Sequence, residues 1–161
     1  MEIVILGNEV LRQKAQEVPE INGETKALAS TMIETMYRGK GVGLAAPQVG
    51  LAQRIFVVGI EGDSPRVFIN PSLLETSEEL SDYEEGCLSI PGVYSKVERS
   101  QAIRIQAWNE RGRPFTLDAD GFLARVILHE YDHLEGVLFI DRLNQMKRER
   151  LLKQYEKRMR A

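Results

Sequence analysis

The chain has 161 residues, of which 43% are hydrophobic and 28% charged, values that are ordinary for a soluble globular protein. A single cysteine excludes an intrachain disulfide and a disulfide-built secreted scaffold, and two histidines exclude a three-histidine metal site within one chain. The net charge of −3 is unevenly distributed, because residues 142–161 carry +6 and residues 1–141 carry −9. We therefore expect an acidic body with a basic end.

The N-terminal ten residues contain no Lys or Arg, and their apolar run is too short for a signal peptide. No stretch approaches the roughly 18 apolar residues that span a bilayer. We expect a cytoplasmic protein without a membrane partner. The absence of repeats, low-complexity tracts and linkers predicts one domain over residues 1–161.

A first helix is predicted over residues 24–38, where Leu28, Met32 and Ile33 recur at helical spacing. It should end in the glycine-rich stretch that follows, because glycine favours helix termination. Strands are predicted where Val, Ile and Phe concentrate or alternate with polar residues, at 54–60, 66–70 (closed by Pro71), 102–108 and 115–117.

Asp118 or Asp120 can cap a helix over about 121–135 that ends at Gly136. A basic C-terminal helix is predicted over 144–159, with an apolar stripe of Leu151, Tyr155 and Met159. The strands cluster between helices instead of alternating with them, which favours an α+β fold over a βαβ fold. We expect antiparallel or mixed β-sheets packed around the helix at 121–135, with one further helix near each terminus.

That central helix contains the sequence His129-Glu130-Tyr131-Asp132-His133, an HExxH pattern. Four residues advance a helix by about 400°, so both imidazoles lie within about 40° of each other and can meet one metal ion. Glu130 is then near a water at the metal, the arrangement of metal-assisted hydrolysis with a carboxylate base. The alternative is chance spacing on a solvated helix, which the apolar neighbours of the motif disfavour.

A catalytic site of this kind needs a third protein ligand. Downstream candidates are Asp141, Glu149 and Glu156, and the upstream candidate is Cys87. A thiolate is a good ligand for a divalent transition metal, and Gly86 allows close approach of the backbone. Cys87 could instead be a small buried hydrophobe or a nucleophile paired with a histidine.

Residues 41–50, GVGLAAPQVG, form a glycine-rich segment. Its G-x-G-x-x-A pattern does not predict a dinucleotide loop, because a helix precedes it and a strand follows. Small side chains leave the backbone accessible, and Gln48 offers an amide that can donate to an oxyanion. A tight connector with no chemistry is the alternative.

In that order, GVGLAAPQ, EGCLS and HEYDH, the last continued by Leu134-Glu135-Gly136, resemble the motifs of the peptide deformylase family over essentially the whole chain. The resemblance implies a hydrolase of N-terminal methionine processing in protein biosynthesis, which removes the formyl group from formyl-methionyl nascent peptides and releases formate. A zinc endopeptidase using the same HExxH is the alternative enzyme, and a non-enzymatic binding module is a third.

The resemblance also implies the roles of the site residues. Cys87, His129 and His133 become the metal ligands, and Glu130 becomes the general base and then the acid. Gln48 and the backbone N–H of Leu88 become the oxyanion donors. The implied metal is Fe²⁺, which Ni²⁺, Co²⁺ or Zn²⁺ can replace, whereas ligand type alone suggests Zn²⁺. Besides His129, the implied methionine pocket consists of Val42, Gly43, Gly86, Tyr94, Phe122 and Val126.

Three positions depart from the usual family pattern. Leu128 stands where Gln is frequent before the first histidine. Lys40 stands where relatives have Glu, so a salt bridge to Arg99 is impossible and the loop must be held otherwise. Arg125 stands at the pocket rim, where we expect its stem to pack and its charged head to stay in water.

The basic helix at 144–159 has two interpretations. It is either a solvated helix face, as most runs of charge are, or a surface that docks on ribosomal RNA, as the resemblance suggests. The segregation of charge favours docking. No DNA partner is expected.

Overall fold

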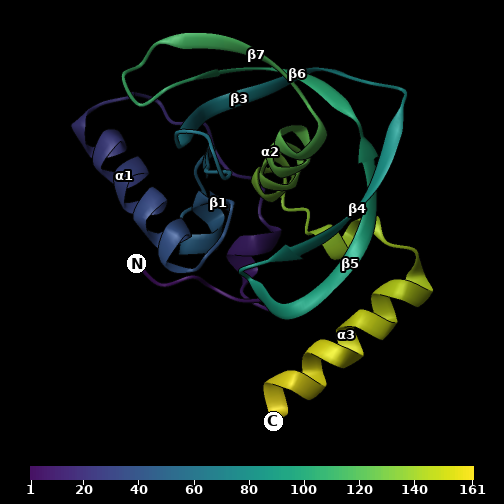
Figure 1. Cartoon of the computed structure of the whole chain (residues 1–161). Coiled ribbons are helices and arrows are strands. Elements are labelled where there is room, and N and C mark those ends of the chain that lie inside the picture. Colours follow the sequence, from purple (N-terminus) through teal and green to yellow (C-terminus); the bar gives the residue numbers. More distant parts are fainter.

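The computed structural model describes residues 1–161 as three helices and seven strands (Figure 1). The helices are α1 (Gly23–Arg38), α2 (Gly121–Leu134) and α3 (Gln145–Arg160). The strands are β1 (Gly43–Ala45), β2 (Ile55–Val58), β3 (Arg66–Thr76), β4 (Leu80–Cys87), β5 (Ile90–Ser100), β6 (Ala102–Trp108) and β7 (Pro114–Asp120). Short 3₁₀ helices cover Glu9–Arg12, Ala46–Val49 and Phe139–Arg142.

The strands form a five-stranded sheet in the order β1-β2-β3-β6-β7 and a separate hairpin of β4 and β5. Every named pair is antiparallel. The sheet and the hairpin surround α2, which lies in the middle of the molecule (Figure 1). The predicted α+β fold with a central helix is confirmed, with antiparallel sheets.

α2 is central because nine of its 14 residues are buried and it packs against the sheet, chiefly against β1, β2 and β7. Asp120 is extended, and Gly121 has a φ of 58°, a left-handed conformation that favours glycine, so the chain turns sharply from β7 into the helix. Ile127 and Leu134 are fully buried in the same cluster as Phe56 and Phe68. Asp120 is the residue before the helix, but its side chain makes no capping hydrogen bond.

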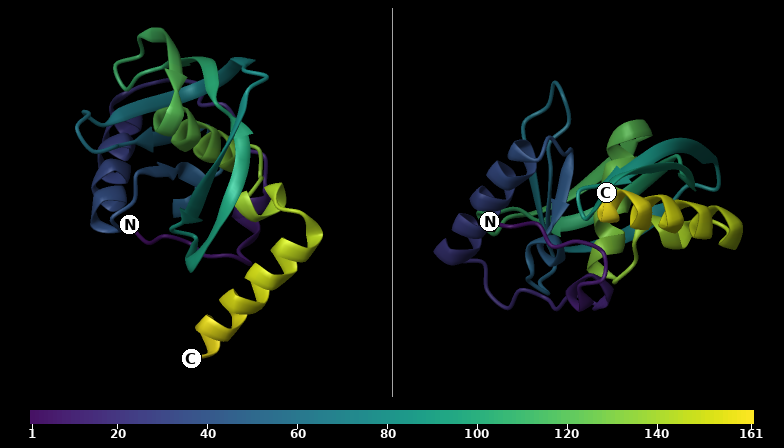
Figure 2. Two further views of the ribbon diagram at one scale, coloured as in Figure 1. Left: turned by 45° about the vertical axis from the view of Figure 1, so that its right-hand side comes forward. Right: turned by 90° about the horizontal axis from the view of Figure 1, so that it is seen from below.

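α1 and α3 cover opposite parts of the body (Figure 2). α1 packs on β1 and β2, with Met32 and Met36 fully buried. α3 lies at the margin against β5, where Leu151 and Tyr155 join the hairpin core. The third member of the predicted stripe, Met159, lies near the end of the helix and is 47% exposed. None of the helices has the length and apolar character needed to cross a membrane.

The sequence prediction was wrong at three places in the sheets. It missed β1, which lies inside the glycine segment, and it missed both strands of the hairpin. It also ended the second predicted strand at Pro71, whereas β3 continues to Thr76. The structure accommodates Pro71 through a register shift between Ile69 and Ser72, and irregular positions of this kind are where proline is tolerated in a strand.

Candidate active site

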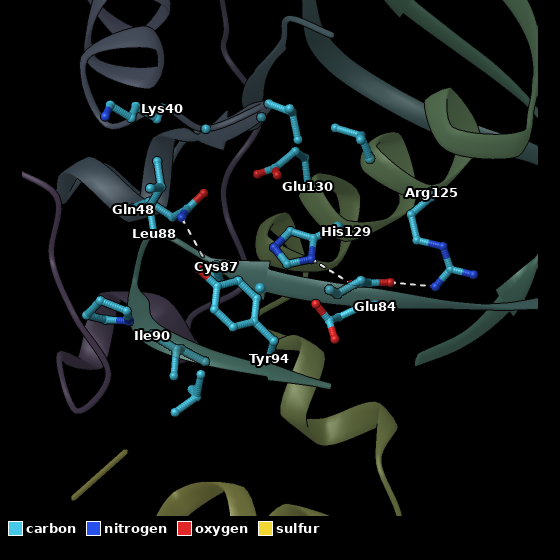
Figure 3. A pocket seen from close by; sticks show the side chains of 18 of the residues that line it. Lys40, Gln48, Glu84, Cys87, Leu88, Ile90, Tyr94, Arg125, His129 and Glu130 are labelled. Atoms are coloured by element: carbon cyan, nitrogen blue, oxygen red, sulfur yellow. Dashed lines mark hydrogen bonds and ion pairs between the residues drawn. The ribbon is translucent and has the colours of Figure 1, made fainter. Parts of the chain in front are cut away.

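A cavity of about 350 Å³ opens between the glycine segment, the turn of the hairpin and one face of α2 (Figure 3). Its lining includes Gln48 from the glycine segment, Cys87 from the end of β4, and His129 and Glu130 from α2. Elements that are distant in the sequence therefore bring the three sequence motifs to one site.

Cys87, His129 and His133, named here the Cys–His–His cluster, offer ligand atoms that all lie within 4.8 Å of one another. Cys87 Sγ lies 3.4 Å from His133 Nε2. A tetrahedral ion with a sulfur bond of about 2.3 Å and a nitrogen bond of about 2.0 Å separates these atoms by roughly 3.5 Å. The spacing of the cluster thus fits a single transition-metal ion.

Local structure explains why these side chains converge. His129 and His133 are one turn apart on α2, and their ring centroids are 5.1 Å apart. Cys87 reaches the cluster from the end of β4, where the pairing register of the hairpin shifts between Glu85 and Cys87, just before the chain turns. A Cβ atom at Gly86 would lie 2.5 Å from the Tyr94 ring, so a larger residue at this bend would force that ring to move.

Glu85, which the sequence reasoning missed, holds His129 in place. Its Oε1 lies 2.8 Å from His129 Nδ1, and because a carboxylate only accepts, the ring nitrogen donates and Nε2 is left to face the cluster. Arg99 donates to both Glu85 oxygens at 2.6 and 3.0 Å. Burial opposes ionisation of Glu85, but hydrogen bonds from His129 and Arg99 outweigh it and keep its pKa well below the usual range.

Glu130 is buried beside the cluster, and its Oε1 has no hydrogen-bond partner. Burial is the main cause that raises the pKa of Glu130 to about 7. A buried carboxylate whose pKa lies near neutrality is suited to accepting and returning a proton. Its other oxygen packs against Gly43, where a Cβ atom would lie only 2.5 Å away.

The amide of Gln48 is fixed from both ends. Its Oε1 accepts a hydrogen bond from the Ala45 N–H at 2.9 Å. Its Nε2 lies 3.2 Å from Ser89 Oγ and 3.4 Å from Cys87 Sγ (Figure 3). The donor end of a buried amide is therefore aimed at the cluster. Leu88 lies in the turn directly after Cys87.

Comparisons with known proteins place the whole arrangement in one family. The polypeptide deformylase family model matches residues 1–149. The chain is 58% identical over 135 residues to peptide deformylase 1 of Clostridium perfringens, covering 83% of this chain and 91% of that protein. Its structure resembles the peptide deformylase of Thermus thermophilus, with a TM-score of 0.91, 46% identity and coverage of 96% and 92% of the two chains. The chain belongs to the polypeptide deformylase family.

A further relative of known structure is the peptide deformylase of Synechococcus elongatus in complex with actinonin, with a TM-score of 0.92, 44% identity and coverage of 96% and 86%. Deformylases are metal-dependent hydrolases that remove N-formyl groups from nascent peptides, and the predicted family and function are confirmed. The zinc endopeptidase alternative is not favoured. The family model ends inside α3.

The other candidates for the third metal ligand lie elsewhere in this deformylase. Asp141 binds Arg12 and accepts from the Leu138 N–H, away from the cluster. Glu149 and Glu156 are exposed on α3. The structure therefore brings Cys87, and none of the downstream carboxylates, to the two histidines.

All six residues expected in the methionine pocket line the same cavity. Gly43, Gly86 and Val126 lie deeper, whereas three other side chains are 40–62% exposed at its rim: Val42, Tyr94 and Phe122. Their contact with a substrate stays a prediction.

Two of the departures from the deformylase pattern have structural consequences. Lys40 forms no ion pair, and its loop is held by backbone bonds such as that from the Gly41 N–H to the Met36 carbonyl, 2.9 Å. The expectation for Arg125 was wrong, because its head is buried rather than in water and the whole residue is only 4% exposed. Its guanidinium is buried because Glu85 and two backbone carbonyls accept from it.

Proposed function

We propose that this chain removes the formyl group from formyl-methionyl nascent peptides with a divalent metal held by Cys87, His129 and His133. The convergence of these three ligand atoms beside the unpartnered carboxylate of Glu130 carries the proposal. The donor set fits the group, because a thiolate and two imidazoles suit a transition metal and Glu85 already orients one imidazole.

The resemblance to deformylases favours Fe²⁺ as the native metal, with Ni²⁺, Co²⁺ or Zn²⁺ able to take its place. When bound, the ion supplies Lewis acidity, which lowers the pKa of water to near neutrality. Cys87 supports Fe²⁺ and Zn²⁺ alike, so the metal is to be identified by elemental analysis of protein purified without air.

Glu130 would move the protons. A buried carboxylate at this position would take a proton from the attacking water and pass that proton to the leaving amine. Its burial and its lack of a competing partner keep the carboxylate available for both transfers.

Gln48 and the Leu88 N–H would receive the negative charge that develops on the formyl oxygen. Gln48 is already oriented by Ala45 and Ser89, so no reorganisation is needed when the charge appears. A donor of this kind typically contributes about 2.7–4 kcal/mol to transition-state stabilisation.

The peptide beyond methionine would lie extended beside the Gly41–Leu44 backbone. β1 is the last strand of its sheet and pairs only with β2, so no strand occupies its other edge, where an added strand would pair short of the Ala45 N–H that already donates to Gln48. The methionine side chain would enter the pocket lined by the six residues named above: Val42, Gly43, Gly86, Tyr94, Phe122 and Val126.

Formate release tests the activity. Protein loaded with Fe²⁺ or Ni²⁺ under nitrogen should release formate from formyl-Met-Ala-Ser and leave casein intact. Glu130→Gln serves as the control, because it keeps the size of the side chain and removes the base. Casein cleavage without formate release would refute the deformylase activity.

We also propose that α3 docks on the ribosome and that the protein works in the cytoplasm, where nascent chains emerge, with no DNA partner. Leu151 and Tyr155 anchor the helix, while the basic residues Lys147, Arg150, Lys153 and Lys157 are exposed. Truncating residues 147–161 would remove both anchors, so replacing these four exposed residues with Glu is the cleaner test. If this variant co-sediments with ribosomes at low salt as well as the unmodified protein does, the docking proposal is refuted.

A further inference from the structure

Arg125, a buried residue of α2, makes four hydrogen bonds to the hairpin of β4 and β5. Its guanidinium donates to Glu85 Oε2 at 2.7 Å and to the Val97 carbonyl at 2.6 Å. It also donates to the Ser81 carbonyl at 2.8 Å and to Ser81 Oγ at 3.1 Å. One buried side chain of the central helix thus holds both strands of the hairpin, since Ser81 and Glu85 lie on β4 and Val97 lies on β5.

These two elements carry different ligands of the Cys–His–His cluster. The hairpin carries Cys87, two residues after Glu85, and α2 carries His129, one turn after Arg125. Glu85 is the meeting point, because one of its oxygens accepts from Arg125 and the other accepts from His129. Figure 3 shows Arg125 and His129 joined in this way on one side of the cavity.

We propose that Arg125 is a positioning residue that sets the distance between the Cys87 thiolate and the histidine ligands. The inference rests on the proposed metal site and extends it to a residue that does not touch the metal. Arg99 lies on β5 itself and also joins the hairpin to α2, through side-chain contacts to Glu85 and Asp132, whereas Arg125 reaches from α2 to the backbone of the hairpin. Arg125 alone connects α2 to the Val97 and Ser81 carbonyls.

Replacement of Arg125 by Met would keep the aliphatic stem and remove the four donors. Glu85 would lose one partner, and the carbonyls of Ser81 and Val97 would each lose a donor, so the hairpin would no longer be fixed at this point. Contacts that orient metal ligands are typically worth 10- to 100-fold in metal affinity. We expect Co²⁺ to leave Arg125→Met about 10- to 100-fold faster than it leaves the unmodified protein.

The test is Co²⁺ release to a chelator, together with the absorption bands of the cobalt-loaded protein. These bands depend on the geometry of the thiolate and imidazole ligands and do not report general stability. Arg125→Lys restores a single donor group, so its release rate should fall between those of the other two proteins. Arg104→Met is the matched control, because Arg104 binds only Asp118 and Glu75 at the surface.

Unchanged cobalt bands and an unchanged release rate in Arg125→Met, even with a lower Tm, would overturn the proposal. If Arg125→Met does not fold, Arg125→Lys decides, and a release rate equal to that of the unmodified protein overturns the proposal. Failure of the proposed function is a separate result, since an unmodified protein that binds no Co²⁺ through Cys87 lacks the metal site itself.

Discussion

Gly43→Ala tests whether the position of the Glu130 carboxylate controls the rate. A Cβ atom at residue 43 would lie 2.5 Å from Glu130 Oε2 and 2.9 Å from both Cδ and Cγ, while ordinary contact begins at about 3.4 Å. The φ angle of Gly43 is not in the left-handed region, so the added methyl acts through this contact and not through backbone strain. The carboxylate must therefore retreat by about 0.9 Å.

A misplacement of about 1 Å can cost roughly 100-fold in rate, which corresponds to about 2.7 kcal/mol. We expect Gly43→Ala to lower kcat for formate release by about that factor. The KM for formyl-Met-Ala-Ser should be unchanged, because the methyl points toward Glu130. Metal content should also be unchanged, because the methyl does not point toward a ligand of the Cys–His–His cluster.

The matched control is Gly23→Ala at the start of α1, where an added Cβ meets no atom within 4 Å. Its kcat should equal that of the unmodified protein. The reasoning fails if Gly43→Ala keeps its kcat within twofold. It also fails if KM alone rises, because the methyl would then be obstructing the peptide and not the base.

Three further predictions concern the metal and its base. Glu130→Gln should keep its metal and lose about 10²- to 10⁴-fold in kcat, and loss of metal as well would make Glu130 a ligand. Cys87→Ser should bind metal more than about 100-fold more weakly, and normal metal content would exclude the thiolate as a ligand. A chelator should abolish formate release and lower the Tm, since an ion at 1,000 times its Kd stabilises a fold by about 4 kcal/mol. Added Ni²⁺ should restore both, and an unaffected Tm would contradict a buried metal site.

Helices and apolar strands could be predicted because each has a strong pattern of its own. The hairpin has none. β4 reads LSDYEEGC, with most of its side chains exposed, and β5 contains Pro91 and Gly92 near its start, which both predict a break. Its stability comes from distant partners, including Tyr155 of α3 and Arg125 of α2, which no local window of the sequence contains. The sequence therefore made Cys87 a candidate ligand but did not predict where it lies in the fold.

The same limit applies to the site. The HExxH spacing predicted that His129 and His133 share a face, because one helical turn fixes it. No sequence pattern of this kind marks Glu85 or Arg125 as part of the site. Arg125 was expected to reach water, since a charged head at a cavity rim usually does. Its burial could not be predicted because the carbonyls of Ser81 and Val97 that accept from it belong to the hairpin that the sequence did not reveal.

The buried polar side chains of α2 fall into two groups: those that support the site have hydrogen-bond partners, and the carboxylate proposed to react has an oxygen without one. A buried polar group normally needs a partner, and Arg125 and Asp132 each have several. In the whole chain, only three buried side-chain atoms lack a hydrogen-bond partner, and two of them are Glu130 Oε1 and His133 Nδ1 on this helix. An unpartnered buried carboxylate is costly unless something else uses it. The fold therefore leaves a free carboxylate at the cavity, beside the Cys–His–His cluster, where the proposed reaction needs a base.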